Sequence, residues 1–343
     1  MFEQQHFTPG YFPEIVQGPW TQSARQRALD QEVEAHYMEY FGRAMKFRNW
    51  SPWHDLPLAE IEQLGPRLSQ ETIQLIEGFF GIEEYVGDYV LEGLAMFRLN
   101  RVRRNLQLQW GAEEARHGVT WELILKHSRA RTVEQLQEYL EKVHDCRWHV
   151  HQHPGIESPL GSAAYAMVQE RATYFNYQEM RLRIREEYGL PPSRTGEEQQ
   201  RGYETGAAEA FRVVAQDELA HHGLFLRLVQ SYIKYFPSLT FEVLTRVFQG
   251  FVMPALRLIP NARAFLRAGR QTRIFSRDTY EERVRNPVLK SLGLEGNEAF
   301  EKAVVLARRL PENLGPDSVK LSRTGEWVGA YSQPLVSPCG DKG

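Results

Sequence analysis

Two segments of this chain carry a glutamate followed three residues later by a histidine, within an otherwise apolar stripe. The first pair is Glu114 and His117, and the second is Glu218 and His221. A separation of three places both side chains on one face of a helix, so each pair can converge on a single ion. The spacing therefore predicts half of a metal site on each of two helices.

Two further segments each place one acid at an apolar position. Glu83 interrupts the stripe of 69–100, and Glu170 interrupts that of 160–188. Four unpaired carboxylates in an apolar core would cost more free energy than a marginally stable domain tolerates, unless cations bind or protons neutralise them. One glutamate from each of two helices, with Glu-x-x-His from each of two others, is typical of ferritin-like di-iron or di-manganese bundles. Oxygen-rich ligation with only two imidazoles favours iron or manganese over structural zinc.

A third Glu-x-x-His pair, Glu141 and His144, has the same spacing without the apolar context. Glu134, Glu138 and Asp145 extend a polar row beside it, which is typical of a solvated helix face. Because roughly one such pair is expected by chance in a chain like this, the spacing alone identifies no ligand. For the six residues in apolar stripes, the alternative to a metal site is a metal-free polar network.

Helices must position these side chains, because 3.6-residue periodicity recurs in long blocks and strand-like alternation is lacking. We expect an all-α fold, with a ferritin-like four-helix bundle core at about 69–234, additional flanking helices, and one domain over 1–343. The expected helices span 23–46, 69–100, 103–128, 132–147, 160–188, 201–234 and 239–257, with weaker ones toward the C-terminus. Loops are expected at 153–161 and 189–202, where Pro and Gly cannot continue a helix. The stretch from about Pro311 is expected to be irregular.

Composition argues against several classes of protein. A formal net charge of -3 and a pI near 6.4 give no global electrostatic case for binding nucleic acid or an anionic membrane. The two cysteines, Cys146 and Cys339, lie far apart without metal-type spacing, so no disulfide framework or zinc ribbon is indicated. No N-terminal targeting pattern occurs, and no stretch approaches the roughly 20 apolar residues of a membrane-spanning helix. We expect a cytoplasmic protein without membrane insertion.

Arginines gather in the segment that follows the expected core. Arg263, Arg267 and Arg270 share one face if that segment is helical. Four more follow at Arg273, Arg277, Arg283 and Arg285. The pattern fits either a solvated face or a docking surface for an acidic partner.

Several local motifs are similar to those of one known family, the soluble acyl-carrier-protein desaturases. They are "EEARHG" (113–118), "QERAT" (169–173), "DELAHH" (217–222), "NWSPWHDLP" (49–57) and "MPA" (253–255). The motifs occur in order, and the resemblance covers about 45–310. Two departures stand out: "IEEYVGDYV" replaces a proline-containing turn of the family, and "DELAHH" lacks the arginine before the ligand histidine.

The resemblance implies specific roles for ten residues. The iron ligands would be Glu83, Glu114, His117, Glu170, Glu218 and His221, the same six that the stripes select. Asp217 would accept a hydrogen bond from the imidazole of His117, and Glu113 would do the same for His221. Trp50 would lie on an electron or hydrogen-bond route toward the site, and Thr173 would handle protons beside bound oxygen. The stripe prefers Glu83 to its neighbour Glu84, which falls on a row with Glu77 and Asp88.

The same resemblance implies an activity. The protein would be an oxygen-dependent desaturase with two iron ions, introducing a double bond into a fatty acyl thioester, most simply one held on acyl carrier protein. A ferredoxin-type donor would supply electrons, and two chains would form a homodimer. Other functions stay open: oxygen insertion into a carrier-tethered substrate, a ribonucleotide-reductase-like radical subunit using Tyr174 or Tyr177, and iron storage or simple metal binding. The "QERAT" wording argues against the radical subunit, and the length of the chain argues against storage.

Overall fold

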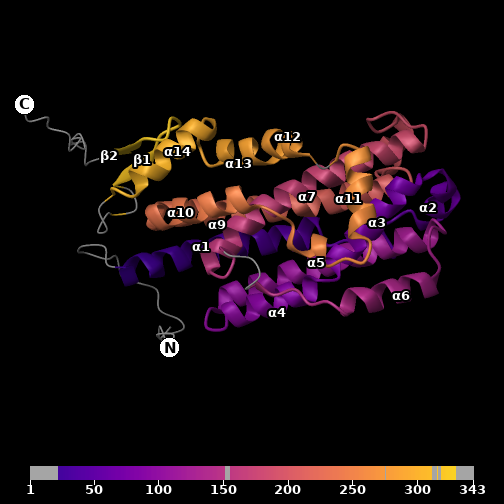
Figure 1. Ribbon diagram of the computed structural model, residues 1–343, viewed down its shortest axis with the longest axis horizontal. Helices are drawn as coiled ribbons and strands as arrows, with labels where there is room; N and C mark the ends of the chain where they lie inside the picture. The colour runs from indigo at the N-terminus through magenta and orange to yellow at the C-terminus, as the bar shows by residue number, and fades with distance from the viewer. Residues whose placement is uncertain (1–21, 151–154, 275, 311–314, 316–317, 330–343) are drawn as a thin grey trace, which may run out of the picture.

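The computed structural model describes residues 22–150, 155–274, 276–310, 315 and 318–329. Long helices run side by side along the length of the molecule (Figure 1), which confirms the expected all-α fold. The α-helices are α1 (Gln22–Phe47), α2 (Leu58–Leu64), α3 (Gln70–Glu83), α4 (Val86–Met96), α5 (Arg101–His127), α6 (Val133–His144), α7 (Pro159–Glu187), α8 (Gly196–Arg201), α9 (Ala207–Tyr235), α10 (Pro237–Gly250), α11 (Ala262–Gln271), α12 (Arg277–Tyr280), α13 (Asn286–Ser291) and α14 (Gly296–Ala307). Shorter helical segments are η1 (Gly65–Arg67), η3 (Pro254–Arg257) and η4 (Glu281–Arg285).

The core is a bundle of α3, α5, α7 and α9, with α1 packed against α5 and α9. Aromatic contacts show that α5 and α9 are antiparallel. Trp110 of α5 meets Phe225 of α9 at 6.4 Å between ring centres, whereas Trp121, further along α5, meets Phe211, earlier on α9, at 4.5 Å. Apolar stripes along long helices drive them to pack in bundles with those stripes turned inward.

Two clusters of buried apolar side chains fill the bundle, one toward each end. One includes Trp110, Met167 and Phe225, and the other includes Trp121 and Tyr177. Between them, α5, α7 and α9 each bury polar residues that belong to neither cluster. The polar residues therefore lie in the middle of the bundle, with apolar packing on either side.

Side-chain caps start two of the three long helices that carry motif residues, α5 and α7. The side chain of Asn100 accepts a hydrogen bond from the backbone N–H of Arg103, and that of Ser158 accepts from Gly161. Such caps satisfy donors that the first helical turn leaves free, and Pro159 at the first position of α7 loses no hydrogen bond. The caps define where α5 and α7 begin, about three turns before their motif residues.

Glycines let α5 approach its neighbours closely. A Cβ atom at Gly111 would lie 2.2 Å from a methyl of Val90, and one at Gly118 would lie 3.3 Å from the Cβ of Glu83. Only glycine fits the first position without displacing α4. The glycine of the "EEARHG" motif thus keeps α3 close to α5.

The expectation of one helix over 69–100 is wrong, because α3 and α4 are separate helices that meet at Glu84 and Tyr85. The backbone N–H of Tyr85 donates to the carbonyl of Ile82, three residues back, at 3.3 Å. Neither Pro nor Gly marks this break, so the helical period continues through it in the sequence. The turn leaves Glu83 as the last residue of α3, beside the bundle interior.

Other boundaries also differ from expectation. The helix expected over 201–234 begins at Ala207, and the loop expected over 189–202 contains α8. Strands β1 (Val319–Leu321) and β2 (Trp327–Gly329) form an antiparallel hairpin in the stretch expected to be irregular. Three-residue strands are too short for alternation to be recognised. None of the described helices is both long enough and apolar enough to span a lipid bilayer.

Candidate di-metal centre

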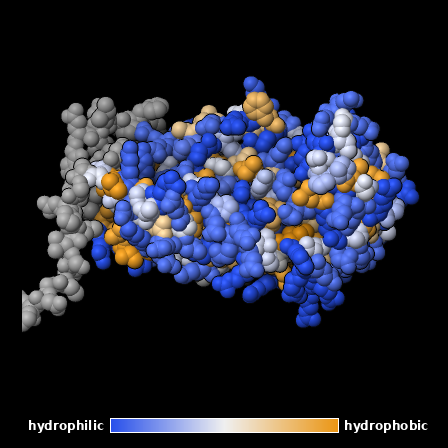
Figure 2. All heavy atoms as spheres, turned by 90° about the horizontal axis from the view of Figure 1, so that it is seen from above, coloured by the Kyte–Doolittle hydropathy of each residue, from blue (hydrophilic) through white to orange (hydrophobic). Residues whose placement is uncertain are grey.

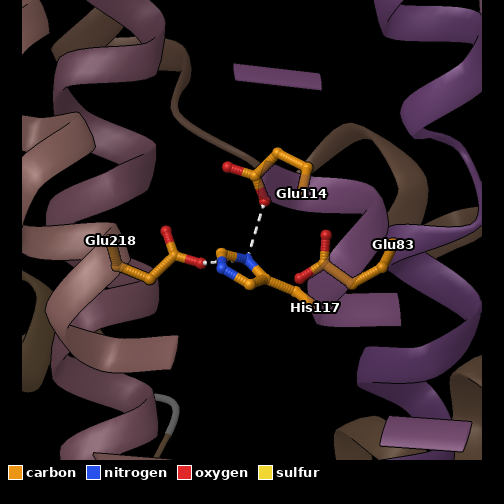
Figure 3. A group of neighbouring side chains, drawn as sticks. All are labelled: Glu83, Glu114, His117 and Glu218. Atoms are coloured by element: carbon orange, nitrogen blue, oxygen red, sulfur yellow. Dashed lines mark hydrogen bonds and ion pairs between the residues drawn. The ribbon is translucent and has the colours of Figure 1, made fainter. Parts of the chain in front are cut away.

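Six side chains from four helices converge between the two apolar clusters. They form two groups whose potential ligand atoms lie within 4.8 Å of one another. The first group is Glu83, Glu114, His117 and Glu218, and the second is Glu114, Glu170, Glu218 and His221. Figure 3 shows the first group, with Glu83 from α3, Glu114 and His117 from α5, and Glu218 from α9 turned toward one another. Glu114 and Glu218 belong to both groups, as bridging carboxylates between two ions would.

Each histidine turns its Nδ1 atom inward to the carboxylates. Nδ1 of His117 lies 3.1 Å from Glu114 Oε2 and 3.3 Å from Glu218 Oε1. Nδ1 of His221 lies 2.9 Å from Glu114 Oε1 and 3.5 Å from Glu170 Oε2. Although close, His221 Nδ1 and Glu114 Oε1 are both buried without a hydrogen bond to any described residue. These two atoms converge on one space, as two ligands of the same cation would.

The outer nitrogen of each imidazole contacts a second acid. His117 Nε2 lies 3.3 Å from Asp217 Oδ2, and His221 Nε2 lies 2.8 Å from Glu113 Oε2. An ionised carboxylate can only accept, so Nε2 of each imidazole donates outward to its acid, and Nδ1 is the nitrogen that could bind a metal once a cation replaces the proton on that side. Hydrogen bonds of this kind fix the ring orientation of a ligand histidine and increase its basicity.

The two outer acids have different partners. Asp217 Oδ2 accepts from Trp50 Nε1 at 2.9 Å and from Arg116 Nη2 at 2.8 Å. Glu113 accepts from the hydroxyl of Tyr40, which reaches it from α1, and from Gln109 at 2.7 Å. The family resemblance placed Trp50 on a route toward the site, and in the structure Trp50 contacts Asp217, which in turn contacts His117.

Burial and like charge act strongly on the carboxyl groups of the cluster. Burial raises the pKa of Glu83 and of Glu170 well above the usual range, and the nearby charge of Glu114 raises both further. Burial also acts to raise the pKa of Glu114, but the charges of His117 and His221 outweigh it and hold that pKa below its usual value. At Glu113, hydrogen bonds from His221 and Tyr40 overcome burial and lower the pKa to about 2.

Both imidazoles have a raised pKa. Burial acts to lower the pKa of His117 and His221, but the surrounding acids, with Glu114 foremost at His117, outweigh that effect. Protons on the histidines and on two carboxyls thus balance the charge of the cluster when cations do not. A divalent ion would displace those protons, as metal binding to such ligands does.

Glu83, rather than Glu84, faces the cluster. The side chain of Glu83 accepts from the Tyr177 hydroxyl at 2.8 Å. Glu84 is 28% exposed and lies 3.6 Å from His144. His144, Glu141 and the acids around them are exposed on α6, so the structure confirms the solvated reading of that third Glu-x-x-His pair.

Three contacts at the cluster come from residues that the sequence did not select. They are Tyr40 with Glu113, Trp110 with Glu170 at 3.2 Å, and Tyr177 as a donor to Glu83. Tyr177 was considered only as a radical carrier, and the other candidate, Tyr174, packs against Arg171 instead. Trp110 lies one turn before Glu114 on the same apolar stripe, and that spacing could have indicated its contact with the cluster from the sequence. Tyr40 lies on a separate helix, and no periodicity connects α1 to the motif.

Apolar space adjoins the cluster. A cavity lies among α4, α5, α7 and α9, and its wall includes Trp110 and Glu170. A smaller pocket shares these two residues and is lined by Thr173 and Met253 as well. The Thr173 hydroxyl lies 2.8 Å from Glu218 Oε2. An elongated apolar molecule would therefore pass beside the carboxylates.

Comparison with known proteins identifies the fold and the family. The family model described as fatty acid desaturase matches residues 104–308, more than half of the chain. The chain belongs to the fatty acid desaturase family. Among curated proteins, none matches it. The crystal structure of DesA2 from Mycobacterium tuberculosis H37Rv, described provisionally as an acyl-ACP desaturase, superposes with a TM-score of 0.51 at 14% identity, covering 78% of this chain and 95% of that one.

The likeness to DesA2 concerns the fold, and it confirms the expected ferritin-like architecture of this desaturase-family chain. Residues 104–308 include most of α5 and all of α7 and α9, and with them five of the six clustered ligand candidates. Glu83 is the sixth, and α3 brings it to the same place from outside the matched range. Buried carboxylates and imidazoles that can hold metal are thus present in a chain of desaturase fold and family.

Proposed function

We propose that this protein is an oxygen-dependent di-iron desaturase acting on fatty acyl chains held as thioesters on acyl carrier protein. The observation that supports this function is the buried cluster of four carboxylates and two imidazoles, in which Glu114 and His221 keep ligand atoms unused. The donor set is rich in oxygen, as iron and manganese prefer. Membership of the desaturase family favours iron for this site.

The residues of the chain would divide the work at this site. Glu83 and His117 would hold one ion and Glu170 and His221 the other, with Glu114 and Glu218 shared. Bound iron would supply dioxygen activation and the removal of two hydrogens from adjacent methylenes. Thr173, bonded to Glu218 and lining the small pocket, is positioned to pass a proton there. The apolar walls would orient the acyl chain and exclude water from the reacting carbons.

Electrons would arrive by the contact chain from Trp50 through Asp217 to His117. Trp50 and Arg116 border a surface hollow that also includes Trp53. The ring of Trp50 lies 4.6 Å from the Arg116 guanidinium, and both donate to Asp217. A ferredoxin-type donor docked at this hollow would lie at the outer end of that contact chain. Electrons could then pass to the site without movement of any segment of the protein.

The arginine face would receive the acidic carrier protein. On α11, Phe265 and Ala268 are buried while Arg263, Arg267 and Arg270 are exposed. These three arginines make no ion pair with any described residue. Figure 2 shows the face formed by α11 to α14, where hydrophilic residues predominate. Met253, which lines the pocket at the cluster, lies shortly before α11 in the chain, so a thioester carried by a partner docked here would start near the site.

Charge reversal tests the docking face. In Arg267→Glu/Arg270→Glu, we expect KM for acyl carrier protein thioesters to rise by about tenfold or more, with kcat unchanged and the effect weakened by salt. Acyl pantetheine, which has no acidic protein, should be converted as before. Arg323→Glu is the matched control, since Arg323 is an exposed arginine on the hairpin side of the molecule, paired with Glu295. An equal rise in KM for both substrates would refute docking at this face.

Product analysis tests the activity itself. The protein is loaded with iron anaerobically, then supplied with an electron donor, oxygen and a panel of acyl carrier thioesters. A product lighter by two hydrogen atoms supports desaturation, whereas one heavier by an oxygen atom supports hydroxylation at the same site. Omission of oxygen or donor should abolish the product. If the metal-replete protein converts no acyl thioester, the proposed desaturase function is wrong.

A radical subunit is the second candidate, because Tyr177 donates to Glu83 from a buried position. A stable tyrosyl signal in electron paramagnetic resonance after oxygen exposure, lost in Tyr177→Phe, would favour it. A desaturase is expected to show no such persistent signal.

We propose that two chains form a homodimer through α1. Met38, Met45 and Phe47 are exposed on and at the end of that helix, and apolar groups of this size are typically buried in interfaces. Sedimentation of the wild type should give a dimer, and Met38→Glu/Met45→Glu should give a monomer. A monomeric wild type would rule the proposal out.

A further inference from the structure

The cavity beside the cluster extends well away from it along the bundle. On α5, its wall runs from Trp110, next to Glu170, back through Leu106 to Arg103. At 1.5 Å per residue, Arg103 is about 16 Å along the helix axis from Glu114. An acyl chain that reacts at the carboxylates would therefore point its distal end toward Arg103.

Arg103 is a charged residue in a largely apolar wall. It is only 5% exposed, and its guanidinium carbon lies 5.9 Å from the centre of the Phe97 ring and 5.5 Å from that of Tyr232. A plain hydrocarbon end needs no cation there. Burying a guanidinium in such a wall is costly unless its donors find acceptors.

One donor of Arg103 is unused. Nη2 lies 3.6 Å from Asp30 Oδ1, beyond hydrogen-bonding distance, and bonds to no described residue. Asp30 is contacted instead by Gln26 at 3.3 Å and by Asn100 at 3.4 Å. Asp30 is thus close enough to offset the charge of Arg103, while the buried Nη2 donor of Arg103 still lacks an acceptor.

We propose that Arg103 is a receptor for a neutral oxygen at the distal end of the acyl chain, such as a terminal hydroxyl or carbonyl. The acceptor would take the unused Nη2 donor. Because Asp30 already offsets the charge of Arg103, a carboxylate at the chain end would meet repulsion that a neutral oxygen avoids. The inference rests on the proposed function, since it takes the cavity as the site of the acyl chain, and it narrows the substrate to chains oxygenated at the far end.

Binding measured without turnover tests this receptor. The full-length, iron-loaded protein is kept anaerobic without a reductant, and binding is followed by the fluorescence of Trp110 and Trp148, which line the cavity. The probes are saturated acyl pantetheines, each compared with its terminally hydroxylated and terminally carboxylated counterparts at several chain lengths. We expect about tenfold tighter binding of the hydroxylated chain at the length that reaches Arg103, and little preference at shorter lengths.

Substitution separates a receptor from a structural arginine. Arg103→Met, which keeps much of the side-chain volume, should remove the preference for the hydroxylated chain and bind the plain chain at least as well. Arg101→Met is the matched control, because Arg101 lies on the same turn but is 76% exposed, and its preference ratio should equal that of the wild type. Should Arg103→Met fail to fold, the wild-type ratios still decide.

The outcomes distinguish this inference from the proposed function. Equal binding of plain and hydroxylated chains at every length, or tightest binding of the carboxylated chain, overturns the receptor while leaving the acyl site intact. Failure of every probe to bind overturns the acyl site as well. A hydroxyl preference that persists in Arg103→Met also contradicts the assignment.

Discussion

Ionisable side chains are buried in two parts of this bundle, the central cluster and the connection between α7 and α9. In the connection, the fully buried Arg185 donates to both oxygens of Glu198, at 2.9 and 3.0 Å, and to Glu204 at 3.2 Å. Its remaining donors reach the carbonyls of Pro191 and Ser193, both at 2.7 Å. In the centre, four carboxylates face two histidines, and ligand atoms of Glu114 and His221 lack hydrogen bonds.

The difference separates a structural network from a binding site. The Arg185 network supplies its own cation and uses its donors fully, so nothing further need bind. The central cluster has more acid than its own groups neutralise, and protonation of Glu83, Glu170 and the histidines makes up the balance. Burial of charge alone does not identify function. A binding site is identified instead by a deficit of cationic partners together with unused ligand atoms.

Removing a shared carboxylate should have the largest effect. Glu218→Gln takes a ligand from both groups, so we expect iron binding and turnover to be lost. In the wild type, iron at 100 times its Kd should stabilise the fold by about 2.7 kcal/mol per site, and this gain should vanish in the variant. Thermal melts with and without ferrous iron, and iron content after desalting, measure it.

Glu141→Gln is the matched control for that experiment, since Glu141 belongs to the exposed Glu-x-x-His pair on α6. Its melting temperature and iron content should equal those of the wild type. Loss of iron from Glu141→Gln, or full iron content in Glu218→Gln, would show that the cluster is not the metal site.

Breaking the other network should cost stability without touching metal. Arg185→Met leaves Glu198 buried without its cation, whereas Glu204 keeps its ion pair with Arg181, and loss of one partner of a buried pair costs about 3–5 kcal/mol. Urea unfolding should show this loss in both the iron-free and iron-loaded protein. Arg129→Met removes an exposed pair with Glu62 and should cost at most about 1 kcal/mol. Equal costs for the two variants would contradict the comparison.

Apolar stripes were sufficient to select the six clustered residues, because each helix must place one face toward the core and a charged residue on that face is conspicuous. Glu170 and Glu218 occupy positions where Leu or Phe would serve packing equally well. The same reasoning chose Glu83 over Glu84, even though it missed the turn between α3 and α4. That turn changes the direction of the chain after Glu83 and so leaves its side chain in place.

Contacts between distant helices could not be obtained in this way. Tyr40 and Glu113 are 73 residues apart, and only the docking of α1 onto the bundle brings them together. The Arg185 network was equally hidden, because its acids lie in the connection between α7 and α9, where Glu198 belongs to the short α8, and not on the apolar stripe of a long helix. One local signal was present: Thr195 and Glu198 form a capping box, whose Thr-x-x-Glu pattern predicts the start of α8.

Substitution of the two outer acids, Glu113 and Asp217, should have the smallest effect, and it best distinguishes their roles. Glu113→Gln and Asp217→Asn keep the side-chain shape and remove only the charge that each imidazole Nε2 contacts. We expect each to weaken iron binding by about 10- to 100-fold, as loss of a hydrogen-bond partner behind a ligand histidine usually does. Competition with a chelator measures the affinity, and the optical spectrum of the oxidised iron reports whether His117 or His221 is perturbed.

The two variants should then diverge in one respect. Asp217 also holds Trp50 and Arg116, whereas Glu113 holds Tyr40 and Gln109. If electrons pass along the Trp50 side, Asp217→Asn should slow reduction of the bound iron by the donor more than its loss of affinity explains, and Glu113→Gln should not. Stopped-flow reduction at saturating iron separates these effects. Equal reduction rates in both variants would assign the outer acids to ligand orientation alone and leave Trp50 without a part in electron transfer.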